Sequence, residues 1–153
     1  MSDVAGIYAR ESEHLDRYIQ FGIAQGRVLS VEFPEQPDPG ADAEHELLDR
    51  IEAYLNGADD SFEDVTVAMT MPTDQGTVLE KVREVPYGED ATVEQITMMV
   101  PGHNPEDSED RQAVRDALAS NPAPIFIPTH RVGDGPSGLP GDVERRLRLI
   151  EGI

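Results

Sequence analysis

The spacing of apolar residues differs between the two halves of the chain, and the first stretch is typical of β-structure. Residues 17–34 alternate loosely between apolar and polar positions, and Ala24-Gln25-Gly26 offers a turn that contains glycine. Alternation with a period of two on both sides of such a turn predicts a β-hairpin. Pro34 ends the second strand, because proline has no N–H to donate to a ladder.

A helix and one more strand are predicted to complete the first 70 residues. Asp42 is a candidate N-cap for a helix over residues 43–56, which Asn56-Gly57 ends. The apolar positions of this helix recur at the spacing of one helix face, at Leu47, Leu48, Ile51 and Leu55. Val65–Met71 is expected to form a short strand. This part of the chain therefore predicts a small α+β unit.

The second half is predicted to be mostly helical. Apolar residues at helical spacing favour a helix over residues 75–85. Thr92 followed by Gln95 has the form of a capping box, which opens a short helix that ends at Met99. We assign Met99 and its neighbour Met98 to the hydrophobic core.

Two further helices are expected, over Ser108–Ala119 and Val143–Glu151, with an extended, proline-rich apolar segment over residues 121–128. Two short helices around a turn make a helix-turn-helix candidate, although that pattern alone is weak. The predicted fold class is α+β. A small N-terminal α/β domain with a short antiparallel sheet, residues 1–72, precedes a mainly helical, winged-helix-like domain, residues 73–153.

Composition excludes several kinds of chemistry. The chain of 153 residues has no cysteine, which rules out disulfides, zinc–thiolate sites, iron–sulfur clusters and a thiol nucleophile. Its four histidines are scattered, so we expect neither a metal site nor a cofactor. No apolar run approaches the roughly 18 residues that a membrane span needs. The charged N-terminus has no apolar signal core, so a cytoplasmic protein is expected.

Acidic residues are in large excess and are spread along the whole chain. Thirty-one acids face twelve bases, which gives a formal net charge of −19, and Lys81 is the single lysine. Dispersed acid with almost no lysine is typical of halophilic proteins, since in molar salt the Debye length is only about 3 Å. Residues 111–153 carry six arginines against five acids, so if any face of the protein meets a polyanion, we expect it to lie there.

One segment resembles the motif of a known family. Residues 120–132 read Ser-Asn-Pro-Ala-Pro-Ile-Phe-Ile-Pro-Thr-His-Arg-Val. This string is similar to Asn-Pro-x-Pro-x-x-x-Pro-Cys-His-Arg-Val, the active-site motif of the DNA alkylguanine alkyltransferases, also called methylated-DNA–protein-cysteine methyltransferases. Every signature position matches except the cysteine, where this chain has Thr129. Residues 85–89, Val-Pro-Tyr-Gly-Glu, resemble the turn that leads into the family's helix-turn-helix.

The resemblance implies roles for individual residues. The family flips an alkylated guanine out of the duplex and transfers the alkyl group to its cysteine. His130 corresponds to the histidine that activates the thiolate, and Arg131 to the arginine after it. Glu151 corresponds to the supporting glutamate, and Asn121 is expected to tie the helix-turn-helix to the pocket. A threonine hydroxyl cannot replace the thiolate, so we predict that the chain has no alkyltransferase activity.

Other positions depart from the family pattern. The base-displacing arginine aligns with Gln112, and the tyrosine that helps to turn the nucleotide aligns with Val93. Four acids lie in the turn before the recognition helix: Glu106, Asp107, Glu109 and Asp110. They oppose DNA phosphates unless salt screens them. The candidate DNA-binding residues, in the minor groove or beside it, are Arg111, Gln112, Arg115, Val93, Asn121 and Arg131.

Three functions remain open at this point. The first is a monomeric, non-catalytic protein that binds double-stranded DNA, recognises alkylated bases and works with other repair proteins. The second is an interaction module that keeps the fold and no longer binds DNA. The third is an enzyme with a new nucleophile.

Single residues also keep alternative interpretations. Thr129 belongs to a relic pocket, to a damage-recognition pocket, or to the structural framework. His130 is either a structural histidine or a catalytic group. The arginines of the last predicted helix either meet phosphate or form a solvated helix face: Arg145, Arg146 and Arg148.

Overall fold

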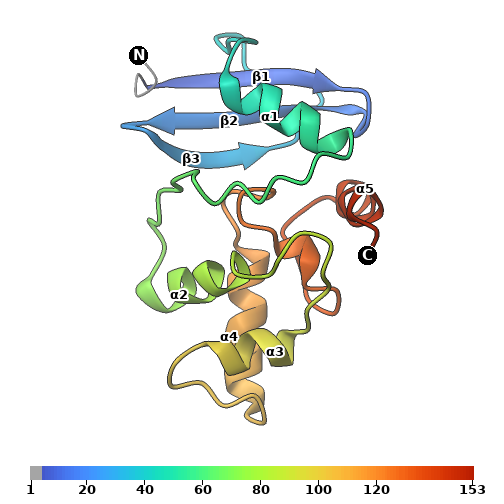
Figure 1. Cartoon of the computed structure of the whole chain (residues 1–153). Helices are drawn as coiled ribbons and strands as arrows, with labels where there is room; N and C mark the ends of the chain where they lie inside the picture. The colour runs from blue at the N-terminus through green and yellow to red at the C-terminus, as the bar shows by residue number, and fades with distance from the viewer. Residues whose placement is uncertain (1–4) are drawn as a thin grey trace. The chain divides into compact units, whose positions relative to one another are not determined.

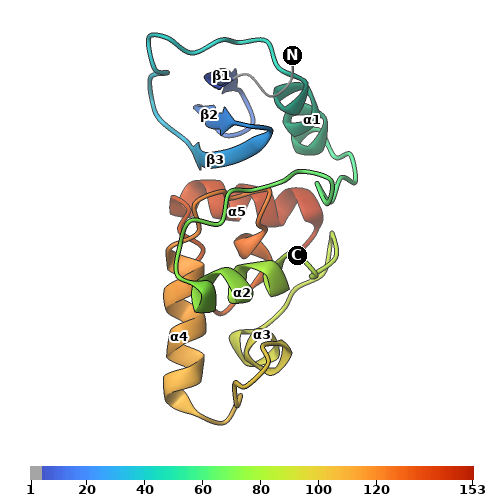
Figure 2. The ribbon, with the colours of Figure 1, turned by 90° about the vertical axis from the view of Figure 1, so that its left-hand side faces the viewer.

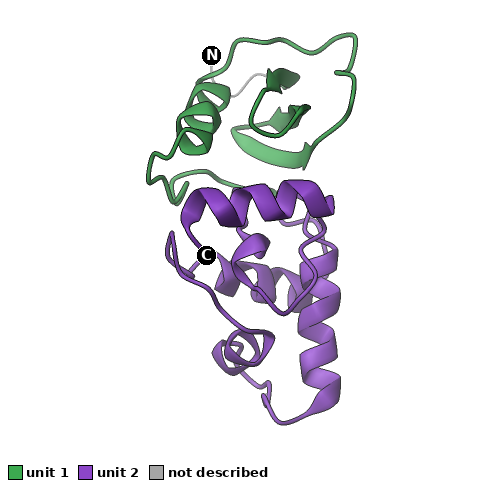
Figure 3. Ribbon diagram, turned by 90° about the vertical axis from the view of Figure 1, so that its right-hand side faces the viewer, with its two compact units in different colours: residues 1–68 green, residues 69–153 purple. Residues whose placement is uncertain are grey.

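The computed structural model describes residues 5–153, which belong to two compact units, residues 1–68 and residues 69–153 (Figure 3). The described part of the first unit holds three strands and a helix, and the second is built from helices and loops (Figure 1). The predicted α+β class is confirmed by this content. No helix within residues 5–153 combines the length and the apolar character that crossing a membrane requires.

The sheet of the first unit is antiparallel, with the order β1-β2-β3. Its strands are β1 (Gly6–Ser12), β2 (Arg17–Ala24) and β3 (Arg27–Glu32). The predicted hairpin is formed by β2 and β3, and the turn residues Gln25 and Gly26 have φ angles of 54° and 74°. Positive φ at both positions of a two-residue turn matches the twist of the strands that it joins. The sequence pattern does not predict β1.

Helix α1 (Glu46–Leu55) covers one face of this sheet (Figure 2). Three of its four predicted apolar residues are buried. The predicted cap at Asp42 is wrong, because the backbone of Asp42 pairs with β1 and is held extended. The N-cap is His45, whose ring nitrogen Nδ1 accepts a hydrogen bond of 3.0 Å from the N–H of Leu47.

The strand predicted over Val65–Met71 is reduced to a single bridge. Val67 lies beside Val28 of β3, and Val28 bonds to both neighbours of Val67. The Val28 N–H donates to the Thr66 carbonyl at 2.9 Å, and the Val28 carbonyl accepts from the Ala68 N–H at 2.8 Å. The chain is therefore extended at this point, but the pairing does not continue into a strand.

The second unit contains α2 (Thr73–Val82), α3 (Val93–Met99), α4 (Ser108–Ala119), a short 3₁₀ helix η1 (Thr129–Arg131) and α5 (Gly141–Glu151). The predicted helices are thus present, and α4 has the predicted bounds. Both α2 and α3 pack against α4, the long orange helix of Figure 2. β-Pairing in residues 69–153 is limited to isolated bridges, so the structure shows no β-wing there.

The start of α3 follows the prediction, whereas its outer face does not. The Thr92 hydroxyl accepts from the Gln95 N–H at 3.1 Å, and the Gln95 side chain accepts from the Thr92 N–H at 2.9 Å, which completes the capping box. The core assignment of Met98 and Met99 is wrong: they are 64% and 36% exposed. The opposite face of the helix is buried instead, through Val93, Ile96 and Thr97.

Residues 121–128 fold back on themselves and are not extended as predicted. The Ile127 N–H donates to the Ala123 carbonyl at 2.9 Å, and Pro124 and Ile127 form a bridge. Ile125 has a φ angle of 80°, in the left-handed region that an isoleucine seldom adopts. This turn is buried and leads directly into η1.

Candidate functional site

Asn121 links the end of α4 to the segment that carries Thr129. The residue follows α4 and is 8% exposed. One of its amide hydrogens is donated to the Ile127 carbonyl at 2.8 Å and the other to the Thr129 hydroxyl oxygen at 2.9 Å. Its carbonyl oxygen accepts from the Ala123 N–H at 3.0 Å. The side chain of Asn121 therefore holds both the turn and Thr129 in place.

Thr129 stands at the start of η1 and is fully buried. Its hydroxyl oxygen accepts the bond from Asn121 and donates its hydrogen to the carbonyl oxygen of Ser137 at 2.7 Å. A hydroxyl has a single hydrogen to give. Because a peptide carbonyl is not a base, this arrangement does not generate an alkoxide. The geometry favours a structural threonine at this position.

His130 and Glu151 form a buried pair. The His130 Nε2 atom lies 2.5 Å from the Glu151 carboxylate, and His130 is 1% exposed. Burial lowers the pKa of His130 by more than the hydrogen bond to Glu151 raises it, so the imidazole is neutral at neutral pH. A carboxylate only accepts hydrogen bonds, so Nε2 carries the proton. Burial alone raises the pKa of Glu151, but hydrogen bonds from His130 and Arg131 lower it to about 2.

Arg131 supplies the positive charge that balances Glu151. Its Nε donates to one carboxylate oxygen at 2.8 Å and its Nη2 to the other at 3.2 Å, a bidentate pair. Its Nη1 donates to the Val85 carbonyl at 2.8 Å, and the Gly88 N–H donates to Glu151 at 2.9 Å. We call His130, Arg131 and Glu151 the buried triad. It fastens η1, α5 and the turn at residues 85–88 to one another.

The candidate DNA-binding residues of α4 lie at or near the surface. Gln112 is exposed, and Arg111 and Arg115 are half-buried. Arg111 and Arg115 are four positions apart and share a helix face. The Arg111 guanidinium donates to the Pro105 carbonyl at 2.7 Å, and the Gln112 amide donates to the Asp116 carboxylate at 2.9 Å. Arg111 thus also holds the turn before α4.

The other three candidate DNA-binding residues lie inside the unit. Val93, Asn121 and Arg131 are 1%, 8% and 3% exposed. The Val93 N–H donates to the Asp134 carboxylate at 2.7 Å, which caps α3 from the loop after η1. These three side chains therefore do not belong to the exposed surface of the unit.

The acidic turn before α4 is organised by some of its own carboxylates. Asp107 is the N-cap of α4 and accepts from the Glu109 N–H at 2.8 Å. Asp110 accepts from the Asn104 N–H at 2.8 Å. Acids in the first turn suit the positive end of the helix dipole. Glu106 and Glu109 are exposed to solvent.

Sequence reasoning missed three partners of the site. Asp134 and Ser137 lie in the loop after η1, and no local pattern marks them as partners of Val93 and Thr129. Arg148 donates to the Asp90 carboxylate at 3.0 Å and to the His130 carbonyl at 2.9 Å, so it braces the buried triad. The two other arginines of α5 are exposed: Arg145 and Arg146.

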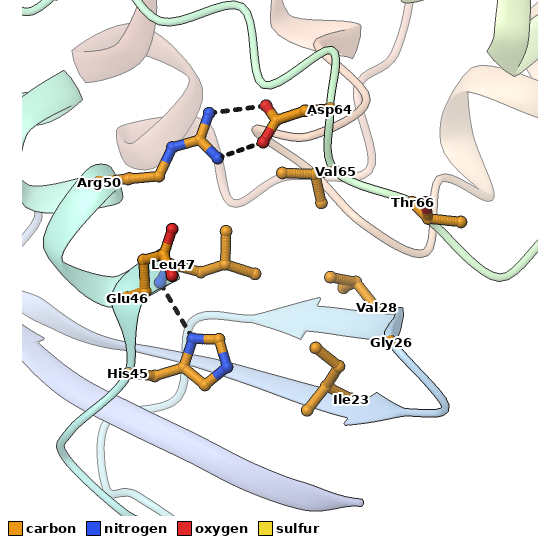
Figure 4. A pocket seen from close by; sticks show the side chains of 10 residues that line it. All are labelled: Ile23, Gly26, Val28, His45, Glu46, Leu47, Arg50, Asp64, Val65 and Thr66. Carbon is orange, nitrogen blue, oxygen red and sulfur yellow. Dashed lines mark hydrogen bonds and ion pairs between the residues drawn. The ribbon is translucent and has the colours of Figure 1, made fainter. Parts of the chain in front are cut away.

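A separate hollow of about 290 Å³ lies within the first unit, lined by β-strand residues, by α1 and by residues 64–66 (Figure 4). Arg50 points toward Asp64 at its side, with a shortest N–O distance of 2.8 Å, and also bonds Asp60 at 2.9 Å. Two carboxylates already balance this guanidinium, so the hollow is a poor anion site. His45 turns its ring nitrogen to the helix backbone as a cap.

Comparison with known proteins identifies relatives of this chain. The family model "6-O-methylguanine DNA methyltransferase, DNA binding domain" matches residues 74–151. The chain is 33% identical over 129 residues to a methylated-DNA–protein-cysteine methyltransferase of Methanopyrus kandleri, covering 81% of this chain and 93% of that one. It is 31% identical to the protein of that name from Metallosphaera sedula, over 69% and 64% of the two chains.

Solved structures share the fold. The O6-methylguanine methyltransferase of Mycobacterium tuberculosis superposes with a TM-score of 0.77 at 20% identity, covering 97% of this chain and 93% of that one. A DNA complex of the OGT protein from the same organism gives a TM-score of 0.75 at 23% identity, over 95% and 91% of the two chains. At such identities the likeness concerns the fold alone, and the sequence matches carry the assignment. The chain belongs to the 6-O-methylguanine DNA methyltransferase family.

Proposed function

We propose that this chain is a non-catalytic DNA-binding protein of its family, which recognises double-stranded DNA, prefers alkylated DNA, and does not accept the alkyl group. One observation carries the proposal. Asn121 binds Thr129 and His130 binds Glu151, but the hydroxyl of Thr129 gives its hydrogen to the Ser137 carbonyl. The family's transfer needs a thiolate, and this chain has no cysteine.

Helix α4 is the proposed DNA-contacting element. It exposes Gln112 and partly exposes Arg111 and Arg115, in the least acidic part of the chain. Arginine side chains on a helix neutralise phosphates and fit the narrow minor groove. Val93, Asn121 and Arg131 would act by holding α3, the turn at 121–128 and the triad in shape.

The protein is proposed to work at high salt concentration. A net charge of −19 with one lysine supports a protein adapted to molar salt. Under such conditions counterion release contributes little to DNA affinity. Binding by a monomer would then rest on shape and on contacts to a flipped base, and its dependence on salt would be shallow.

A second candidate is an interaction module that no longer binds DNA. Two observations favour it. Gln112 stands where the resemblance implies the base-displacing arginine, and its amide is engaged by Asp116. Glu106 and Glu109 are exposed beside α4 and repel phosphates when salt does not screen them.

Two measurements on one set of duplexes separate these functions. Binding is followed in about 2 M potassium chloride, where screening is nearly complete, with plain and O6-methylguanine duplexes of the same sequence. We expect tighter binding of the alkylated duplex and no transfer of a labelled methyl group to the protein. A protein that carries the label would overturn the proposal. Absence of binding at every salt concentration would favour the interaction module.

A matched pair of variants tests the contact face. Arg115→Ala should weaken duplex binding several-fold, because it removes a cation from the exposed side of α4. Arg27→Ala removes an exposed arginine from β3 and should leave affinity unchanged. Equal affinities for the two variants and the parent would show that α4 is not the contact face.

A further inference from the structure

The exposed methionines of α3 border a hollow on the surface of the second unit. Gln95, Met98 and Met99 are three and four positions apart and therefore lie on one face of the helix. Together with residues 84–86 and 89–91 they enclose about 350 Å³. We call this hollow the α3 groove. Met98 is 64% exposed and Met99 is 36% exposed, so the helix presents two neighbouring large apolar side chains to solvent.

The floor of the α3 groove is apolar and its rim is acidic. Val85, Pro86 and Ala91 contribute apolar surface beside the two methionines. The acids at the rim are Glu84, Glu89 and Asp90. The side chains of Glu84 and Asp90 remain 57% and 51% exposed although each has an ion-pair partner, Lys81 and Arg148 respectively. The rim therefore presents negative charge to solvent around an apolar centre.

We propose that the α3 groove binds an amphipathic helical segment of another protein, with apolar side chains toward the methionines and Lys or Arg at its flanks. Unbranched, polarisable methionine side chains adapt to the shape of an apolar partner. An amphipathic helix laid in an apolar groove is a common mode of recognition. In high salt only charges at contact distance still attract each other. Ion pairs between the acidic rim and Lys or Arg of the partner therefore favour a basic flank, which neither DNA nor a second copy of this acidic chain supplies.

The α3 groove and the proposed DNA face use different parts of the second unit. None of the residues that line the groove belongs to α4, whose Arg111, Gln112 and Arg115 are the proposed DNA contacts. Through Asp90 and Arg148 the rim is nevertheless joined to the His130 carbonyl, next to the buried triad. The two proposed sites therefore share no residue.

Methyl NMR with labelled methionine tests the proposal directly. The probe is a synthetic helical peptide with leucines at helical spacing on one face and lysines elsewhere, and its control is a scrambled peptide of the same composition. In potassium chloride we expect shifts of the Met98 and Met99 methyl signals with the first peptide, and unchanged signals from Met69 and Met71. Equal binding of the scrambled peptide would show that charge alone attracts it, and would overturn the proposal.

Two variants make the test specific. Met98→Gln should weaken peptide binding by at least 10-fold, which corresponds to about 1.4 kcal/mol. Leu149→Gln changes another exposed apolar residue, 69% exposed on α5, and should bind as the parent does. Unchanged binding by Met98→Gln would overturn the proposal, as would a parent dimer that this substitution dissociates. DNA binding by Met98→Gln should equal that of the parent, so failure here is separable from failure of the proposed function.

Discussion

At position 129 the hydroxyl group of threonine both accepts and donates a hydrogen bond inside the protein. Thr129 accepts from Asn121 and donates to the Ser137 carbonyl, while His130 is committed to Glu151. The hydrogen of the Thr129 hydroxyl is therefore bound to a backbone carbonyl and not to a base.

Thr129→Cys alone should not reach the transfer rates of the family. The resemblance assigns the base-displacing arginine and the nucleotide-turning tyrosine to Gln112 and Val93, so base flipping stays impaired even when a thiol is present. Transfer of a labelled methyl group from duplex DNA measures the rate, with Thr129→Ser as the control that keeps a hydroxyl. Fast repair by Thr129→Cys would show that Gln112 and Val93 are harmless.

The buried triad should make stability depend on pH. The folded state lowers the pKa of both His130 and Glu151, so it binds fewer protons than the unfolded chain. Such groups stabilise the fold above their unfolded pKa values, and this contribution is lost as pH falls. For His130 the loss begins near its ordinary value of 6.5. The pKa of Glu151 falls from 4.5 to about 2, so its loss follows at lower pH.

We expect the free energy of unfolding to fall between pH 7 and pH 5, by at most about 1.4 kcal/mol per pH unit from His130. His130→Gln should be less stable at pH 7 and should show a smaller slope over that window. His45, whose pKa burial also lowers, should leave a residual slope. Urea unfolding at a fixed concentration of potassium chloride measures the free energy of unfolding at each pH. Equal slopes for the parent and His130→Gln would contradict the assignment.

Among the elements, α4 depends most clearly on its caps. It begins after the Asp107 cap and ends at Ala119, two residues before Asn121, whose side chain organises the motif. Removing the Asp107 carboxylate leaves a helix N–H without its partner and takes a negative charge from the helix N-terminus. A frayed first turn would also loosen Arg111, which is held by Pro105.

Asp107→Ala should therefore lower the free energy of unfolding by about 1 kcal/mol. Glu106→Ala changes an exposed acid one position earlier, and should stay within about 0.5 kcal/mol of the parent. Denaturant unfolding of both variants at the same salt concentration measures the difference. If the two substitutions have equal effects, charge in the turn and not the cap controls the stability of α4.

Elements defined by local signals were predictable, and those defined by distant partners were not. The capping box at Thr92 and the bounds of α4 follow from neighbouring residues. His45 became the cap because Asp42 pairs with β1, a contact 34 positions away. The turn at Ile125 needs a φ angle of 80°, which no propensity of isoleucine predicts. In the site, the motif identified the buried triad, whereas Asp134 and Ser137 were found only through their contacts.

At the scale of the whole molecule, charge is the dominant feature. The acids are dispersed over both units, and most are exposed. Their mutual repulsion opposes the compact state in dilute buffer, and added salt relieves it. This long-range repulsion acts on the whole fold, whereas each ion pair acts locally. The repulsion should therefore dominate the change of stability with salt concentration.

The melting temperature should rise with potassium chloride well beyond about 0.5 M, where the Debye length is already only a few ångströms. Thermal unfolding followed by circular dichroism between roughly 0.1 M and 2 M measures the trend. Sodium chloride at the same concentrations controls for the identity of the cation. A melting temperature that stays flat over this range would contradict adaptation to high salt.

The bond from the Gly88 N–H to Glu151 has a consequence for folding kinetics. It joins positions 63 residues apart, and the Arg131–Val85 bond spans 46. Closing loops of this length costs chain entropy before the contact contributes any stabilising free energy. The triad should therefore assemble after the rate-limiting step, so Glu151→Gln should accelerate unfolding and leave the refolding rate nearly unchanged. The buried triad would then slow the unfolding of the second unit and protect the native state against transient opening.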